Sequence, residues 1–197
     1  MAALTNFVAA ACLATILRPG LPGMARTAAE RDFYIRGHVV LWRVGWLTWH
    51  AAALSLLALF VVLALRARRT APVVSTLALI CGGAGLAADL SAEAVLMGLV
   101  PSVGRAGFVE AERACLLLTG YVGNGLYSLA GALLTAALYR RLPRAVSIVA
   151  IVVWATGFVL SAATLANSVD AEIGATGVLM PAFVAFAVLT ARWLRDS

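Results

Sequence analysis

Charged residues are scarce in this sequence, and their scarcity decides the class of protein. Only 12% of the 197 residues are charged, whereas an ordinary soluble domain carries roughly 25%. Apolar residues make up 63% of the chain, more than a soluble fold of this length can bury or a disordered chain contains. The composition therefore predicts a multi-pass integral membrane protein, which we expect in the inner (cytoplasmic) membrane of the cell.

Lysine is absent, and cysteine and histidine are rare, which excludes several kinds of site. All fifteen basic residues are Arg, and no basic stripe is interleaved with exposed aromatic residues, so the net charge of +6 does not indicate nucleic-acid binding. Cys12, Cys81 and Cys115 lie in apolar runs without a CxxC pair or metal-ligand spacing. His38 and His50 lie about 18 Å apart along one helix, too far to share a metal or a haem. No nucleotide-binding or hydrolase motif is present.

Apolar windows interrupted by short charged segments predict one all-α transmembrane domain over residues 1–197. A helix needs roughly 20 apolar residues to cross the hydrocarbon core of a bilayer, and six windows meet or nearly meet that length. The expected bundle has six transmembrane helices, at about 2–17, 39–65, 72–100, 114–139, 145–169 and 173–194. The first window lacks the positive start and small-residue cleavage site of a signal peptide, so we expect a retained helix.

Arginine clusters predict how this bundle is oriented. They follow the second, fourth and sixth spans, and thus lie on one side of the membrane: Arg66, Arg68, Arg69, Arg140, Arg141, Arg144, Arg192 and Arg195. By the positive-inside rule that side is the cytoplasm, where both termini are also expected. The loop 18–38 on the opposite side holds four Arg and two acidic residues. Its segment 26–37 is expected to form a short interfacial helix.

Glycines concentrate in two of the expected spans. Gly82, Gly83 and Gly85 lie in the third span, and Gly120, Gly123 and Gly125 lie in the fourth. Small residues let membrane helices approach closely, so we expect tight packing here. An unwound segment that binds a ligand is the functional alternative.

Ionisable residues inside two expected spans are the main candidates for function. Arg43 and His50 share a face of the second span with Trp46, and Asp89 and Glu93 share a face of the third. Charges inside a membrane usually face the bundle interior and pair. Similar distances from the connecting turn predict an Arg43–Glu93 pair and a His50–Asp89 pair in the outer half of the bilayer.

The fourth span extends this predicted polar pocket with Tyr121 and Asn124, which lie near the depths of Glu93 and Asp89. Two interpretations without a function for these residues stay open. In the first, the charged residues form an ion-pair network that only stabilises the fold. In the second, Arg43 and Glu93 lie at the membrane surface. In the second interpretation Trp46 belongs to an aromatic belt with its neighbouring tryptophans.

Two sequence runs resemble a bacterial family of small six-helix integral membrane proteins of unknown function. They are LWRVGWLTWHAAALSLLALF at 41–60 and YRRLPRAVSIVAIVVWATGFVLS at 139–161, where a short Arg-Pro turn joins two spans. The resemblance implies a six-helix membrane fold. It implies no activity, substrate or site residue.

Three hypotheses for function follow. The first is a protein that binds or transports a small or lipid-like ligand in a pocket formed by Arg43, Trp46, His50, Asp89, Glu93, Tyr121 and Asn124. The second is an intramembrane enzyme using acid–base chemistry on a lipid-like substrate. The third is an accessory subunit of a larger membrane complex, or a homo-oligomer. No cofactor is predicted, with a single-histidine haem or pigment site at His50 as the alternative.

Overall fold

Helices form nearly the whole of this protein. The computed structural model describes residues 1–23 and 26–196, without the side chains of residues 105 and 106, and this part of the chain contains helices and no strands. Six helices in it are long and apolar enough to cross a membrane. They are Ala2–Gly20, Val39–Ala67, Pro72–Gly98, Gly107–Leu138, Arg144–Leu165 and Val169–Asp196. The predicted fold class, an all-α bundle with six membrane-spanning helices, is confirmed.

Two of these six helices are composite. The first consists of α1 (Ala2–Cys12), the π-helical stretch η1 (Leu13–Leu17) and the 3-10 turn η2 (Arg18–Gly20). The fourth consists of α5 (Arg105–Leu116), the π-helical stretch η3 (Leu117–Gly123) and α6 (Asn124–Leu138). The other four are regular: α3 (Val39–Ala67), α4 (Pro72–Gly98), α7 (Arg144–Leu165) and α8 (Val169–Asp196).

The starts of the helices follow from local sequence. Pro72 occupies the first turn of α4, and Pro143 is the N-cap of α7, where the missing proline N–H has no intrahelical partner to lose. The first loop contains α2 (Ala28–Gly37), as the sequence predicted. Thr27 and Glu30 form a capping box that starts α2.

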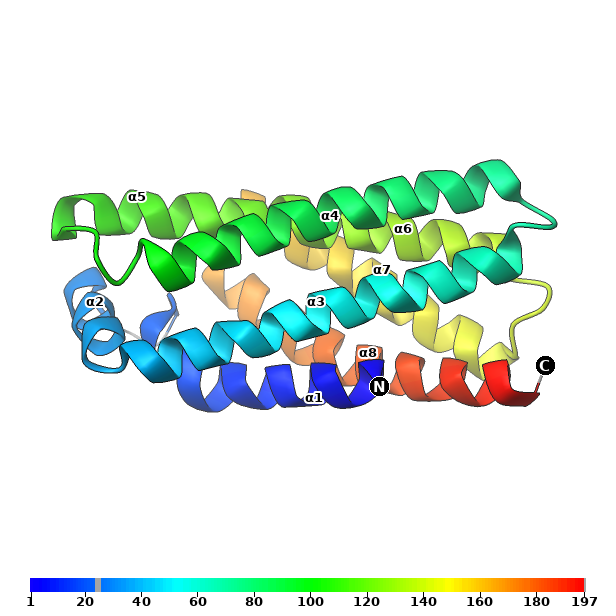
Figure 1. Cartoon of the computed structure of the whole chain (residues 1–197), viewed down its shortest axis with the longest axis horizontal. Coiled ribbons are helices and arrows are strands. Elements are labelled where there is room, and N and C mark those ends of the chain that lie inside the picture. Colours follow the sequence, from blue (N-terminus) through cyan, green and yellow to red (C-terminus); the bar gives the residue numbers. More distant parts are fainter. Residues whose placement is uncertain (24–25, 197) are drawn as a thin grey trace.

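The spanning helices run along the long axis of the molecule (Figure 1). Helix α2 and the α4–α5 connection lie at one end, and the α3–α4 and α6–α7 turns lie at the other. The first residue lies part-way along the bundle, because α1 runs from there toward the end that carries α2.

Two apolar clusters occupy different levels of the bundle. One contains Phe60, Tyr127 and Trp154 and joins α3, α6, α7 and α8. The other contains Trp42 and Phe108 and joins α3 and α4 to the end that carries α2.

Glycines bring the central helices together, as the sequence predicted. A Cβ on Gly85 would lie 3.2 Å from the backbone oxygen of Gly123, so α4 and η3 meet backbone to backbone. A Cβ on Gly120 would lie 2.6 Å from the hydroxyl oxygen of Thr164 on α7. Close contact at these positions favours packing over an unwound binding segment.

The fourth spanning helix begins earlier than the expected residue 114, because charged residues at its start have partners. Glu112 is buried and pairs with Arg31 of α2, while Arg113 donates to Asn167 in the α7–α8 connection. A prediction that begins each span at the first residue of a charge-free stretch starts after Glu112 and Arg113, whereas the helix already includes them. Charge alone therefore misplaced this boundary.

Candidate functional site

The predicted charge pairs inside the membrane are wrong, because Asp89 faces a different neighbour. Its carboxylate accepts hydrogen bonds from the hydroxyl groups of Thr119 on η3 and Tyr127 on α6. The distance from Tyr127 Oη to Asp89 Oδ2 is 3.3 Å. Asp89 is only 7% exposed, so it lies in the interior as expected, but it does not contact His50.

His50 instead contacts Glu93. His50 Nδ1 and Glu93 Oε2 lie in direct contact, without the alignment of a hydrogen bond. Arg43 donates through Nε to the backbone oxygen of Met97, 3.1 Å away, and is exposed. The predicted Arg43–Glu93 pair is therefore absent.

The physical reason is rotation about the helix axis. Counting residues from a turn gives the depth of a side chain but not its direction. Four residues advance a helix by about 40° beyond a full turn. That rotation directs Glu93 toward α3 and Asp89 toward η3 and α6.

The π-helical stretch η3 positions the partner of Asp89. A π-helical turn displaces a side chain from its place in a regular helix, and such turns recur at functional sites. The side-chain amide of Asn124 donates to the backbone oxygen of Thr119 at 3.0 Å, five residues back. Asn124 thereby supports the stretch that brings Thr119 to Asp89.

Thr119 and Tyr127 were missed by sequence reasoning, which chose Tyr121 on the same span. Tyr121 is 42% exposed, and its backbone oxygen accepts a hydrogen bond from Ser161 at 2.6 Å. Tyr127 is buried and directed at Asp89. The sequence does show that the fourth span carries several polar side chains, and this indicates a polar face on that helix. Which of them face Asp89 depends on the irregular turn, and no sequence period predicts it.

Two neighbouring chambers lie beside Thr119, the partner of Asp89 on η3. The small chamber, about 80 Å³, is lined by Asp89, Thr119, Tyr127, Asn124 and aromatic residues. The large chamber, about 460 Å³, lies between the first spanning helix, α3, the fourth spanning helix, α7 and the start of α8. The two share wall residues, namely Trp49, Thr119, Asn124, Leu179 and Met180. The two chambers are therefore direct neighbours.

Two tryptophans in the wall of the large chamber have unpaired indole nitrogens. The Nε1 atoms of Trp46 and Trp49 are buried and have no hydrogen-bond acceptor among the described residues. By contrast, Nε1 of Trp42 donates to the backbone oxygen of Leu96 at 2.7 Å, and Nε1 of Trp154 to the hydroxyl of Thr135 at 2.9 Å. Buried indole N–H groups usually find a partner, so Trp46 and Trp49 are exceptions among the buried tryptophans.

The end of the large chamber is closed by the first loop. Gly23 has a φ of +101°, and a Cβ there would lie 2.7 Å from side-chain atoms of Val169 and Ile173. Glycine is thus required where this loop approaches α8. Leu21, Pro22, Val169 and Ile173 all line the chamber at this end.

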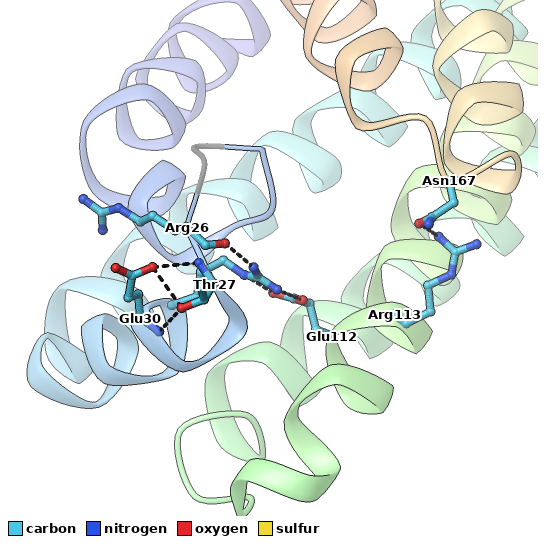
Figure 2. A network of polar contacts seen from close by, with 7 residues as sticks. Arg26, Thr27, Glu30, Glu112, Arg113 and Asn167 are labelled. Atoms are coloured by element: carbon cyan, nitrogen blue, oxygen red, sulfur yellow. Dashed lines mark hydrogen bonds and ion pairs between the residues drawn. The ribbon is translucent and has the colours of Figure 1, made fainter.

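Charged residues fasten this end of the bundle (Figure 2). Arg31 of α2 forms a bidentate ion pair with Glu112 of α5, with nitrogen–oxygen distances of 3.0 and 2.5 Å. Nη1 of Arg113 donates to Oδ1 of Asn167 at 2.5 Å. Figure 2 shows these contacts tying α2 to α5, and α5 to the α7–α8 connection. The network holds the loops around the large chamber in place.

Only some of the predicted site residues line the two chambers. Trp46, Asp89 and Asn124 line one or both of them. Arg43, His50, Glu93 and Tyr121 line neither, and Trp46 is buried rather than part of a surface belt. The haem or pigment at His50 stays a prediction, with one ring nitrogen of His50 held against Glu93.

No family model, curated protein or solved structure matches this chain.

Proposed function

We propose that this protein is an inner-membrane protein that binds an amphipathic, lipid-like ligand in the large chamber. The observation that carries the proposal is the chamber itself, about 460 Å³ between five spanning helices, with Trp46, Trp49 and mostly apolar side chains in its wall. A ligand with an apolar body and a small polar group matches a wall of apolar side chains that also contains a few polar ones, among them Thr119, Asn124 and Thr176.

The size of the large chamber supports a ligand rather than a few waters. Pockets for small molecules enclose about 300–1,000 Å³ and are mostly apolar with a few placed polar groups. The large chamber has about 460 Å³ and is lined largely by apolar side chains of five spanning helices. Arg18 and Glu172 add charge at one end. An alkyl chain with a polar head fits this pattern.

The position of the large chamber supports a ligand that arrives from the membrane. Ala14 on η1 and Gly177 on α8 both line it, and both are exposed on the surface of the bundle. The chamber therefore reaches the outside between the first and last spanning helices. In a bilayer those helices face lipid, so an amphiphile can enter sideways.

Ligand binding is better supported than acid–base catalysis. The catalytic hypothesis places four acid–base groups beside the substrate, namely His50, Asp89, Glu93 and Tyr121. Three of them, His50, Glu93 and Tyr121, lie outside the two chambers. Of the proposed acid–base groups, Asp89 remains in the small chamber, hydrogen-bonded to two hydroxyl groups. A binding function needs only the wall residues that are present.

The experiment fills the chamber and counts bound ligand. Gly177 lines the large chamber and Gly174 does not, yet a Cβ at either position meets nothing within 4 Å. Both lie in α8, so Gly177→Leu and Gly174→Leu should gain similar helix propensity. Native mass spectrometry of detergent-purified protein titrated with dodecanol would count the adducts.

We expect Gly177→Leu to lower dodecanol occupancy about fivefold or more, and Gly174→Leu to leave it within twofold of the parent. Equal occupancy in parent and both variants would show that adducts form on the surface of the bundle. That result would contradict the proposal.

A further inference from the structure

The small chamber contains a buried acidic group without a basic partner. The described residues form two ion pairs between arginine and a carboxylate, Arg31–Glu112 and Arg36–Asp32, and neither includes Asp89. The contact between His50 and Glu93 does not include it either. The two groups that donate to Asp89 are neutral hydroxyls. A carboxylate in the membrane interior normally pairs with a positive charge, because its desolvation is costly.

Aromatic rings surround the same chamber. Trp49, Tyr127, Trp154 and Phe183 line it together with Asp89. The faces of aromatic rings attract cations, most strongly where water is excluded. A carboxylate and several rings around one cavity therefore favour a compact organic cation.

The volume of the small chamber and its position beside the large chamber limit which ligands fit. About 80 Å³ accommodates a small head group and excludes an alkyl chain or a second large group. Trp49, Thr119 and Asn124 line both chambers, so the large chamber begins directly beside the small one. Among the described residues, no basic side chain lines the small chamber, so a head group with a phosphate has no counter-charge there.

We infer that the ligand is an amphipathic amine whose ammonium group lies in the small chamber beside Asp89 while its apolar body fills the large chamber. This inference rests on the proposed function and names the chemical class of its ligand. The positive head balances the charge of Asp89, and the hydroxyl groups of Thr119 and Tyr127 orient the carboxylate toward the cavity.

The test compares three amphiphiles with the same chain: dodecylamine, dodecanol and dodecanoate. The full-length parent protein in detergent is titrated with each and followed by native mass spectrometry. We expect dodecylamine to bind about tenfold more tightly than dodecanol, and dodecanoate to bind most weakly. In Asp89→Asn the amine should lose its advantage, so that amine and alcohol bind within about twofold of each other.

Glu93→Gln is the matched control. Glu93 is a buried carboxylate one helical turn from Asp89 but lines neither chamber, so this variant should keep the preference for the amine. Loss of the preference in both variants, or its survival in Asp89→Asn, would overturn the inference.

The parent protein alone also decides the question if Asp89→Asn does not fold. Dodecanol binding that is sensitive to Gly177→Leu, without preference for dodecylamine, would overturn the amine inference and leave the proposed function standing. Failure of all three amphiphiles to bind in the chamber would overturn both.

Discussion

The hydroxyl group of Tyr127 on α6 donates a hydrogen bond to Oδ2 of Asp89 on α4, with 3.3 Å between the two oxygens. This contact and that of Thr119 join two spanning helices around a buried carboxylate. Asp89 is thereby held at the wall of the small chamber rather than in the interface with α3. The orientation of one carboxylate thus decides which side of α4 carries the candidate site.

Tyr127→Phe should destabilise the protein, whereas Tyr121→Phe should not. Removing the Tyr127 hydroxyl leaves the buried Asp89 with one fewer donor, which costs about 1 kcal/mol at this hydrogen-bond length. Tyr121 is 42% exposed, and its side chain does not contact Asp89. Thermal unfolding in detergent compares the two variants directly. Equal loss of stability would show that Asp89 does not depend on Tyr127.

Trp42→Phe should cost more than Trp46→Phe, although both indoles are buried neighbours on α3. Loss of the Trp42 N–H leaves the backbone oxygen of Leu96 without this donor, at a cost of about 1 kcal/mol. Trp46 donates to no acceptor among the described residues, so replacing its indole removes packing alone. Free energies of unfolding of ligand-free protein test this. An equal or larger cost for Trp46→Phe would mean that its N–H has a partner in the protein.

Glu112→Ala should be among the most destabilising single changes outside the spanning core. It leaves Arg31, which is 9% exposed, as an unpaired buried charge, and breaking such a pair costs about 3 kcal/mol. Glu110→Ala on the same helix is the control, because Glu110 is exposed and its removal should change stability by less than about 0.5 kcal/mol. A double-mutant cycle with Arg31→Ala isolates the pair energy. A coupling near zero would contradict the structural role of this pair.

Acid should loosen α2. The backbone N–H and hydroxyl of Thr27 donate to the carboxylate of Glu30 and hold its pKa below the ordinary value of 4.5. A group whose pKa is lowered by folding contributes stability above its unfolded pKa, and that contribution is lost as the pH falls through the folded pKa. The α2 amides should therefore lose protection against hydrogen exchange as the pH falls below 4.5.

Glu30→Gln is the control for this pH dependence. The variant carries no titrating group at the N-terminus of α2, so its protection should change less between about pH 5.5 and pH 3 than that of the parent. The same pH dependence in both proteins would assign the effect to another group.

The distribution of apolar and charged residues was enough to predict the six spanning helices and the short α2. A membrane helix is defined by its length and apolar content, and both are properties of consecutive residues. The burial of Asp89 and Glu93 could also be predicted from the sequence, because ionisable groups in a spanning segment avoid lipid. The partners of these two residues could not be predicted. The depth of a residue in a helix can be counted along the sequence, whereas the direction of its side chain depends on how the helices rotate and cross.

The sequence by itself determined the class of protein, the number of spanning helices and the presence of ionisable groups inside them. Only the tertiary structure decided that Asp89 meets Thr119 and Tyr127, that His50 meets Glu93, and that Trp46 and Trp49 line the large chamber. The reason is that a π-helical stretch and close glycine contacts change the rotation of neighbouring helices. Such shifts arise from packing between segments far apart in the chain, which hydropathy along the sequence does not record.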